Sequence, residues 1–99
     1  MRIVHNDVEH SFALYTDENE HAGEITYLPV GKNEVQATHT VVPPQFGGKG
    51  YAALLLNALV EWATAEGIKI IPVCSYVVRA FEKNPDQYEA VVKKYSRLD

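Results

Sequence analysis

Apolar and polar residues alternate along much of the first forty positions, which is the pattern of half-buried β-strands. Three segments show it, at 12–15, 22–28 and 34–41. Short polar or glycine-containing turns at 16–20 and 31–33 separate these segments, so the pattern predicts an antiparallel meander. The alternation is strict in the third segment, where the side chains expected to share one face are Val35, Ala37, His39 and Val41. Residues 2–5 are expected to add an edge strand.

Helical spacing replaces alternation from about Gly48 to Glu66. The apolar stripe of this helix consists of Leu55, Leu59, Trp62 and Ala63, and Gly67 is expected to stop it. The apolar segment 68–73 then predicts another strand. A strand, helix, strand succession implies a right-handed parallel crossover joined to the meander.

Two short helices are expected to follow, at about 76–83 and 85–95. Asn84 suits the N-cap of the second, and Pro85 suits its first turn. Its apolar stripe would be Tyr88, Val91, Val92 and Tyr95. The predicted fold class is therefore a mixed α+β or α/β sheet within a single domain spanning residues 1–99. An antiparallel meander comes first, then a βαβ crossover and C-terminal helices.

A glycine-rich stretch lies between the third strand and the long helix. Its sequence is Val42-Pro43-Pro44-Gln45-Phe46-Gly47-Gly48-Lys49-Gly50-Tyr51-Ala52-Ala53. Glycines leave backbone N–H groups unshielded, and a helix N-terminus carries unsatisfied donors and a partial positive charge. This combination predicts a phosphate-binding site, with Lys49 adding a formal charge beside it.

Two familiar phosphate motifs do not fit this stretch. A P-loop needs a glycine five residues before the Gly-Lys pair and a hydroxyl after it, but Pro43 and Gly50 occupy those places. A dinucleotide fingerprint fits Gly48 to Ala53 by spacing. It needs an acidic residue after the next strand, and that strand ends at Cys74 without one.

The stretch resembles the pyrophosphate loop of the GNAT N-acetyltransferases, whose pattern is Q/R-x-x-G-x-G/A after a V-x-P entry. Gly50 and Ala52 match its last two positions, and Gly47 replaces the Gln or Arg, which removes one side-chain contact to the pyrophosphate. Further likeness to short single-domain GNAT-like acetyltransferases lies in His39-Thr40, Pro72-Val73-Cys74-Ser75-Tyr76-Val77 and Asn84-Pro85-Asp86-Gln87-Tyr88. The resemblance extends from about residue 12 to 92.

This resemblance implies acetyl-CoA as the donor, coenzyme A binding, and an amine as the acceptor, either a small molecule or a protein lysine or N-terminus. It also implies that backbone N–H groups near Val41 and Val42 polarise the thioester carbonyl. The usual N-terminal helical segment of the family is missing, so the acceptor side is expected to be open. The residues expected at the CoA site are Val41, Val42, Phe46, Gly47, Gly48, Lys49, Gly50, Tyr51, Ala52, Cys74 and Tyr88.

The family's proton-donating Tyr is replaced here. The run Phe81-Glu82-Lys83 resembles Tyr-Glu-Lys, and Phe cannot protonate the departing thiolate. The candidate catalytic residues are instead Cys74, His39 and Tyr76. Cys74 would accept the acetyl group or line the pocket, with core packing as its alternative. His39 would be a general base, with a structural histidine as its alternative.

Composition narrows the functional class. The 99 residues are 46% hydrophobic and 22% charged, with one Cys and a net charge of -4. That charge argues against nucleic-acid binding, and no apolar run suggests a membrane segment or signal peptide. The scattered His5, His10 and His21 suggest no metal site. We expect a cytoplasmic monomer or weak homodimer that is an acetyltransferase, with a CoA-binding or protein-interaction module of low turnover as the alternative.

Overall fold

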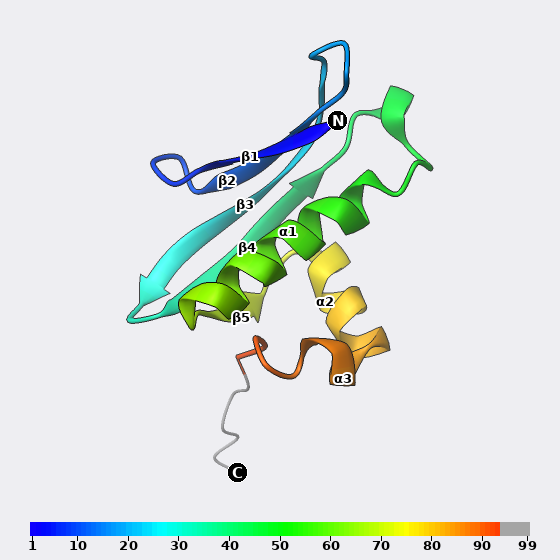
Figure 1. The fold of residues 1–99 in the computed structure, drawn as a ribbon. Coiled ribbons are helices and arrows are strands. Elements are labelled where there is room, and N and C mark those ends of the chain that lie inside the picture. The colour runs from blue at the N-terminus through cyan, green and yellow to red at the C-terminus, as the bar shows by residue number, and fades with distance from the viewer. Residues whose placement is uncertain (94–99) are drawn as a thin grey trace.

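The computed structural model describes residues 1–93 and contains one five-stranded sheet with the order β1-β2-β3-β4-β5 (Figure 1). The first four strands are antiparallel neighbours, and β5 lies parallel to β4. The predicted meander, edge strand and parallel crossover are therefore confirmed. The elements are β1 (Arg2–Asn6), β2 (Ser11–Tyr15), β3 (His21–Gly31), β4 (Glu34–Val41), η1 (Pro44–Phe46), α1 (Tyr51–Glu66), β5 (Lys69–Pro72), α2 (Ser75–Lys83) and α3 (Pro85–Tyr88).

The core lies between the sheet and α1, which packs against β2, β3 and β5. Alternate side chains of the strands enter it, and the helix contributes the stripe that its spacing predicts. Its fully buried large side chains are Leu14, Ile25, Leu55, Leu56, Leu59, Ile70, Val77 and Val91. Removing one such side chain from water is worth about 1.5–3 kcal/mol, so this packing fixes α1 on the sheet.

Helix α1 begins three residues later than its apolar pattern predicts. Gly48 and Gly50 have φ values of 77° and 79°, in the left-handed region, so the chain enters the helix only after Gly50. At the other end Gly67 has a φ of 69° and its N–H bonds the carbonyls of Ala63 and Thr64, which confirms the predicted stop.

The strict alternation predicted for β4 is wrong beyond Ala37. His39 pairs with Thr26 and Ala37 with Tyr27, so β4 has one extra residue, Thr38. Such a β-bulge reverses the facing of every later side chain. As a result His39 and Val41 are exposed on the sheet face opposite α1, rather than lying with Val35 and Ala37 on the core face.

The second C-terminal helix is much shorter than the predicted 85–95. After α3 the chain turns and pairs with the outer edge of β5, where the Ile70 N–H donates to Val91 O at 2.6 Å and the Lys93 N–H donates to Ile70 O at 2.8 Å. An uninterrupted helix would leave these edge groups unpaired. Asn84 takes the N-cap position without a side-chain bond. The predicted helical Tyr95 lies outside the described residues.

The sheet face opposite α1 is not covered by any helix of the described residues. It exposes apolar side chains from three strands, namely Val4, Leu28 and Val41. None of the described helices is long and apolar enough to cross a membrane.

Gly23 of β3 lies close to the end of β4 and to a side chain of α1, so its replacement should destabilise the fold. A Cβ built there lies 3.0 Å from the Val41 carbonyl oxygen and 3.2 Å from Leu55 Cδ1. We expect Gly23→Ala to lower the free energy of unfolding by about 1–3 kcal/mol in urea denaturation. The control is Gly31→Ala, whose nearest contact is 3.5 Å away; its effect should stay below about 1 kcal/mol. Equal effects of the two changes would contradict this account.

Candidate functional site

Strands β4 and β5 separate where the bulge begins. They pair only from Glu34 with Lys69 to Ala37 with Pro72. The Ala37 carbonyl accepts the N–H groups of both Val73, at 3.2 Å, and Cys74, at 2.9 Å, which turns the chain away from β4 and into α2. The rest of β4 has no strand on that side among the described residues, so a wedge opens between the two elements.

Cys74 lies in this wedge as the N-cap residue of α2. Its Sγ is 3.5 Å from Thr40 Oγ1 on the opposite wall. Burial raises the pKa of the Cys74 thiol, but hydrogen bonds from the Thr40 hydroxyl and from the N–H groups of Val77, Tyr76 and Thr40 outweigh it. The pKa of the thiol is therefore below its ordinary value, so the thiolate forms at a lower pH than in a free cysteine.

The glycine loop leaves the first turn of α1 open to an anion. The N-cap Gly50 has no side chain to bond the free N–H groups, and no acidic residue lies in the first turn. A Cβ built at Gly48 or Gly50 meets nothing within 4 Å. Both residues are exposed, so the space above them can receive a ligand.

A groove with a cavity of about 340 Å³ runs between the first turn of α1 and α2. One wall is Ala53, and α2 contributes Tyr76 and the two cations Arg79 and Lys83. Buried Tyr88 of α3 closes it. Burial first, and then the neighbouring Tyr88, raise the pKa of Tyr76, so this phenol keeps its proton at neutral pH.

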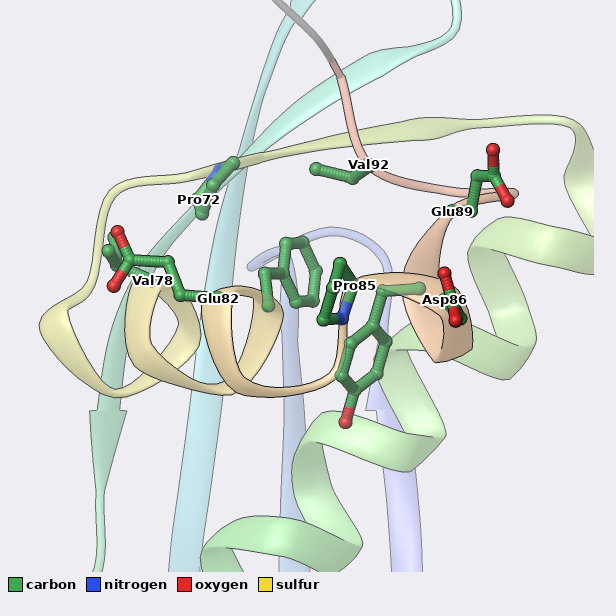
Figure 2. A pocket seen from close by; sticks show the side chains of 9 residues that line it. Pro72, Val78, Glu82, Pro85, Asp86, Glu89 and Val92 are labelled. Carbon is green, nitrogen blue, oxygen red and sulfur yellow. The ribbon is translucent and has the colours of Figure 1, made fainter.

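A second cavity of about 340 Å³ lies on the other side of α2 (Figure 2). Its walls include Pro72, Val78 and Val92, and the carboxylates around it belong to Glu82, Asp86 and Glu89. Its negative charge is unsuited to phosphates. Charge therefore distinguishes two cavities of equal volume, and only the groove with Arg79 and Lys83 suits a polyanion.

The structure brings many of the predicted site residues together around α1 and α2. Gly48, Gly50 and Ala52 lie at the helix entrance, while Tyr76 and Tyr88 line the adjoining groove. Gly47 is extended and donates its N–H to Pro44 O. Partly buried Val42 packs against the core.

Other predicted residues point elsewhere. The side chains of Phe46, Lys49 and Tyr51 line a hollow of about 310 Å³ that faces the acidic turn at 16–20. His39 lies on the opposite face of β4 from Thr40, whose hydroxyl contacts Cys74. No cluster of three metal-binding side chains occurs within residues 1–93.

Sequence reasoning missed Thr40, Arg79 and Lys83. The two cations could have been found, because Tyr76, Arg79 and Lys83 follow one another at helical spacing and so share a face. Thr40 could not, because its approach to Cys74 depends on the bulge.

Phe81 has no polar role in this arrangement. It is buried, and its ring lies 4.6 Å from the ring of Tyr88. Phe81 therefore has no proton to offer at the position where the resemblance implies a proton-donating Tyr.

Comparison with known proteins agrees with this geometry. A family model described as GCN5-related N-acetyl-transferase matches residues 11–91. A solution structure of a GCN5-like protein from Staphylococcus aureus is 36% identical, has a TM-score of 0.75, and covers 98% of this chain and 92% of its own. Protein NATD1 of Xenopus tropicalis is 28% identical over 85 residues, which are 86% of this chain and 78% of that protein.

The human Protein NATD1 is 27% identical over the same share of this chain and 75% of its own length. The crystal structure of Tetrahymena GCN5 is similar in fold alone, with 13% identity, a TM-score of 0.62, and coverage of 88% of this chain and 62% of that one. Because the family model spans most of the sheet, the glycine loop and α2, the chain belongs to the GCN5-related N-acetyl-transferase family.

Proposed function

We propose that this protein is an acetyl-CoA-dependent N-acetyltransferase acting on a primary amine. The observation that carries the proposal is the continuity of three features. An uncapped helix N-terminus opens into a cationic groove, and the wedge beside that groove holds a thiol of lowered pKa. A long, anionic ligand with a reactive end suits all three.

The glycine loop would hold the pyrophosphate. The N–H groups of Gly48 and Gly50 and those of the first turn of α1 would donate to its oxygens. Arg79 and Lys83 would face the remaining phosphate charge, which supports binding despite the Gly at position 47. Tyr88 would line the path of the pantetheine arm.

Coenzyme A supplies an activated acetyl thioester. The backbone of β4 would polarise its carbonyl, since the Thr40 backbone is among the groups that lower the pKa of the Cys74 thiol and so lies on the wedge side of β4. Successive N–H groups of an extended strand point in opposite directions. The Val42 N–H would therefore share this direction, whereas the Val41 N–H would point towards β3.

Cys74 and Tyr76 are the groups proposed to manage the leaving sulfur. A thiol with a lowered pKa gives its proton readily to a more basic thiolate, and the protonated Tyr76 is a second donor in the same groove. Cys74 would also be a competent nucleophile if the acetyl group passed through the protein.

The amine would approach from the uncovered sheet face, where His39 is exposed beside the wedge. A neutral imidazole there would accept the amine proton. The acceptor would be a small amine or a lysine or N-terminus of a protein, because the face has no helical layer to restrict its size. The second candidate function is a CoA-binding module with little turnover, which Phe81 at the family's Tyr position favours.

The glycine loop can be tested with two matched substitutions. Gly50→Ala and Gly67→Ala each place a Cβ on a left-handed residue at one end of α1, with nothing within 4 Å. Their folding costs should be similar, about 1–2 kcal/mol. In calorimetric titration, Gly50→Ala should weaken CoA binding at least about tenfold, or about 1.4 kcal/mol, and Gly67→Ala should not. Equal CoA affinity in both variants would place the phosphates elsewhere.

The pH dependence of Cys74 alkylation tests its environment. A lowered pKa means that the thiolate forms at lower pH, so the midpoint of the pH–rate profile with iodoacetamide should lie below that of glutathione. Thr40→Val removes one stabilising bond and should raise the midpoint. Thr64→Val makes the same chemical change on an exposed part of α1 and should leave it unchanged. CoA should protect the thiol, and a glutathione-like midpoint without protection would leave Cys74 as packing.

Turnover separates the two candidate functions. The protein would be incubated with acetyl-CoA and, separately, a lysine peptide, a peptide with a free N-terminus and a small primary amine. CoA release should exceed the background, and Cys74→Ala should lower it at least about tenfold. Tight binding without release would favour the CoA-binding module. An acetyl group on Cys74 in the intact mass would support covalent transfer, and acetylation confined to lysines would contradict it.

A further inference from the structure

A cluster of aromatic rings lies at the end of the sheet remote from the glycine loop, and the proposed chemistry does not use it. His5 stacks on Phe12 at 4.1 Å and meets the edge of Trp62 at 4.9 Å. The Tyr27 ring lies 4.9 Å from that of Trp62, and the His10 ring lies 5.3 Å from that of Tyr27. A 2.6 Å hydrogen bond joins His5 Nε2 to Tyr27 OH and holds the cluster together.

A cavity of about 280 Å³ opens against these rings. His10, Tyr27 and Trp62 form its aromatic side, and Val35 and Ile68 add aliphatic surface. The turns β1–β2 and β3–β4 border it, at the end of the sheet opposite the α1 N-terminus (Figure 1). Trp62 lies eleven residues after Tyr51, about 16 Å along the helix axis, so this cavity is separate from the CoA groove.

Two carboxylates lie at the cavity, those of Asp7 and Glu34. Glu34 already pairs with Lys93, with Oε2 2.6 Å from Nζ. Asp7 forms no salt bridge within residues 1–93. Burial raises the pKa of Tyr27, and the negative charge of Asp7 raises it further, so Asp7 acts electrostatically on this ring. The lining of the cavity therefore includes two carboxylates and no Lys or Arg.

His10 is held in an uncommon conformation that presents its ring to this site. Its φ is 61°, in the left-handed region, and its carbonyl accepts the Tyr27 N–H at 2.9 Å. A non-glycine residue there costs about 1–2 kcal/mol, and such strain gathers at functional sites.

We propose that this cavity binds an alkylated ammonium group, held against the rings of Tyr27, Trp62 and His10 and balanced by the Asp7 carboxylate. The ring faces attract a cation, and methyl groups on the nitrogen replace the hydrogen bonds that a bare ammonium would need from the largely apolar walls. The lining disfavours anions because of its carboxylates. The volume is near the lower end of ligand pockets, which suits a single head group.

Such a head group has two sources, a free quaternary amine and the trimethylated lysine of a peptide. Both offer the same chemistry to the rings, and the experiment can separate them. The probes are choline and a trimethyl-lysine peptide. Their neutral counterparts are 3,3-dimethyl-1-butanol, in which carbon replaces nitrogen, and the same peptide with norleucine in place of the modified lysine.

The single Trp of the chain reports directly on this site, because it is Trp62. The folded protein would be titrated while its tryptophan fluorescence is measured. Choline or the trimethyl-lysine peptide should produce a saturable change with half-saturation at about 1 mM or below, and its neutral counterpart should not. A response to the peptide alone would identify a modified protein as the source. No saturable change with either cation, or equal responses to the neutral counterparts, would overturn the proposal.

Two variants test the residues that carry the proposal. Asp7→Asn should weaken choline binding at least about threefold, whereas Glu18→Gln makes the same charge change in the exposed turn after β2 and should not. The β1–β2 turn should survive, because the Asn6 side chain and not Asp7 accepts its N–H groups. His10→Asn keeps a residue that tolerates positive φ and removes the ring, so it should weaken binding as well. Unchanged choline affinity in both pocket variants would overturn the proposal, and calorimetric CoA binding should remain unaltered in them.

Discussion

The separation of β4 from β5 at Ala37 is the constraint on which the rest of the site depends. One extra residue, Thr38, bends β4, and β5 ends at Pro72. The Ala37 carbonyl then accepts two N–H groups in succession, which starts α2 at the wedge. Thr40 consequently faces Cys74 across the opening, and β4 beyond Ala37 has no strand partner on that side within residues 1–93. A regular β4 would close the wedge with ladder hydrogen bonds and leave no space between the strands.

Helix α2 has cationic side chains on one side and a carboxylate on the other. One of its sides presents Arg79 and Lys83 to the groove beside α1, and the other presents Glu82 to a cavity that also contains Asp86. The chain has a net charge of -4, yet Arg79 and Lys83 lie beside an uncapped helix N-terminus that already favours anions. Local rather than overall charge would therefore direct the proposed polyanionic ligand to one side of this nine-residue helix.

The packing of Phe81 explains why the proposed chemistry moves to the start of α2. Its ring is buried against the Tyr88 ring, and a phenylalanine side chain carries no proton to donate. The N-cap of the same helix instead has a thiol surrounded by N–H groups and the Thr40 hydroxyl. A helix N-terminus stabilises negative charge on such a group, which favours a lowered thiol pKa at the start of α2.

The amino-acid sequence by itself determined the meander, the crossover, α1 and its glycine ends. These follow from local periodicity and from residues such as Gly50 and Gly67, whose positive φ few other residues adopt. The glycine loop and Cys74 could be predicted in the same way. Tertiary structure decided the bulge that turns His39 outward, the contact of Thr40 with Cys74, the early end of α3 and the ring cluster around Tyr27. Each depends on pairing between distant segments, because the edge of β5 and the register of β3 with β4 override local propensity.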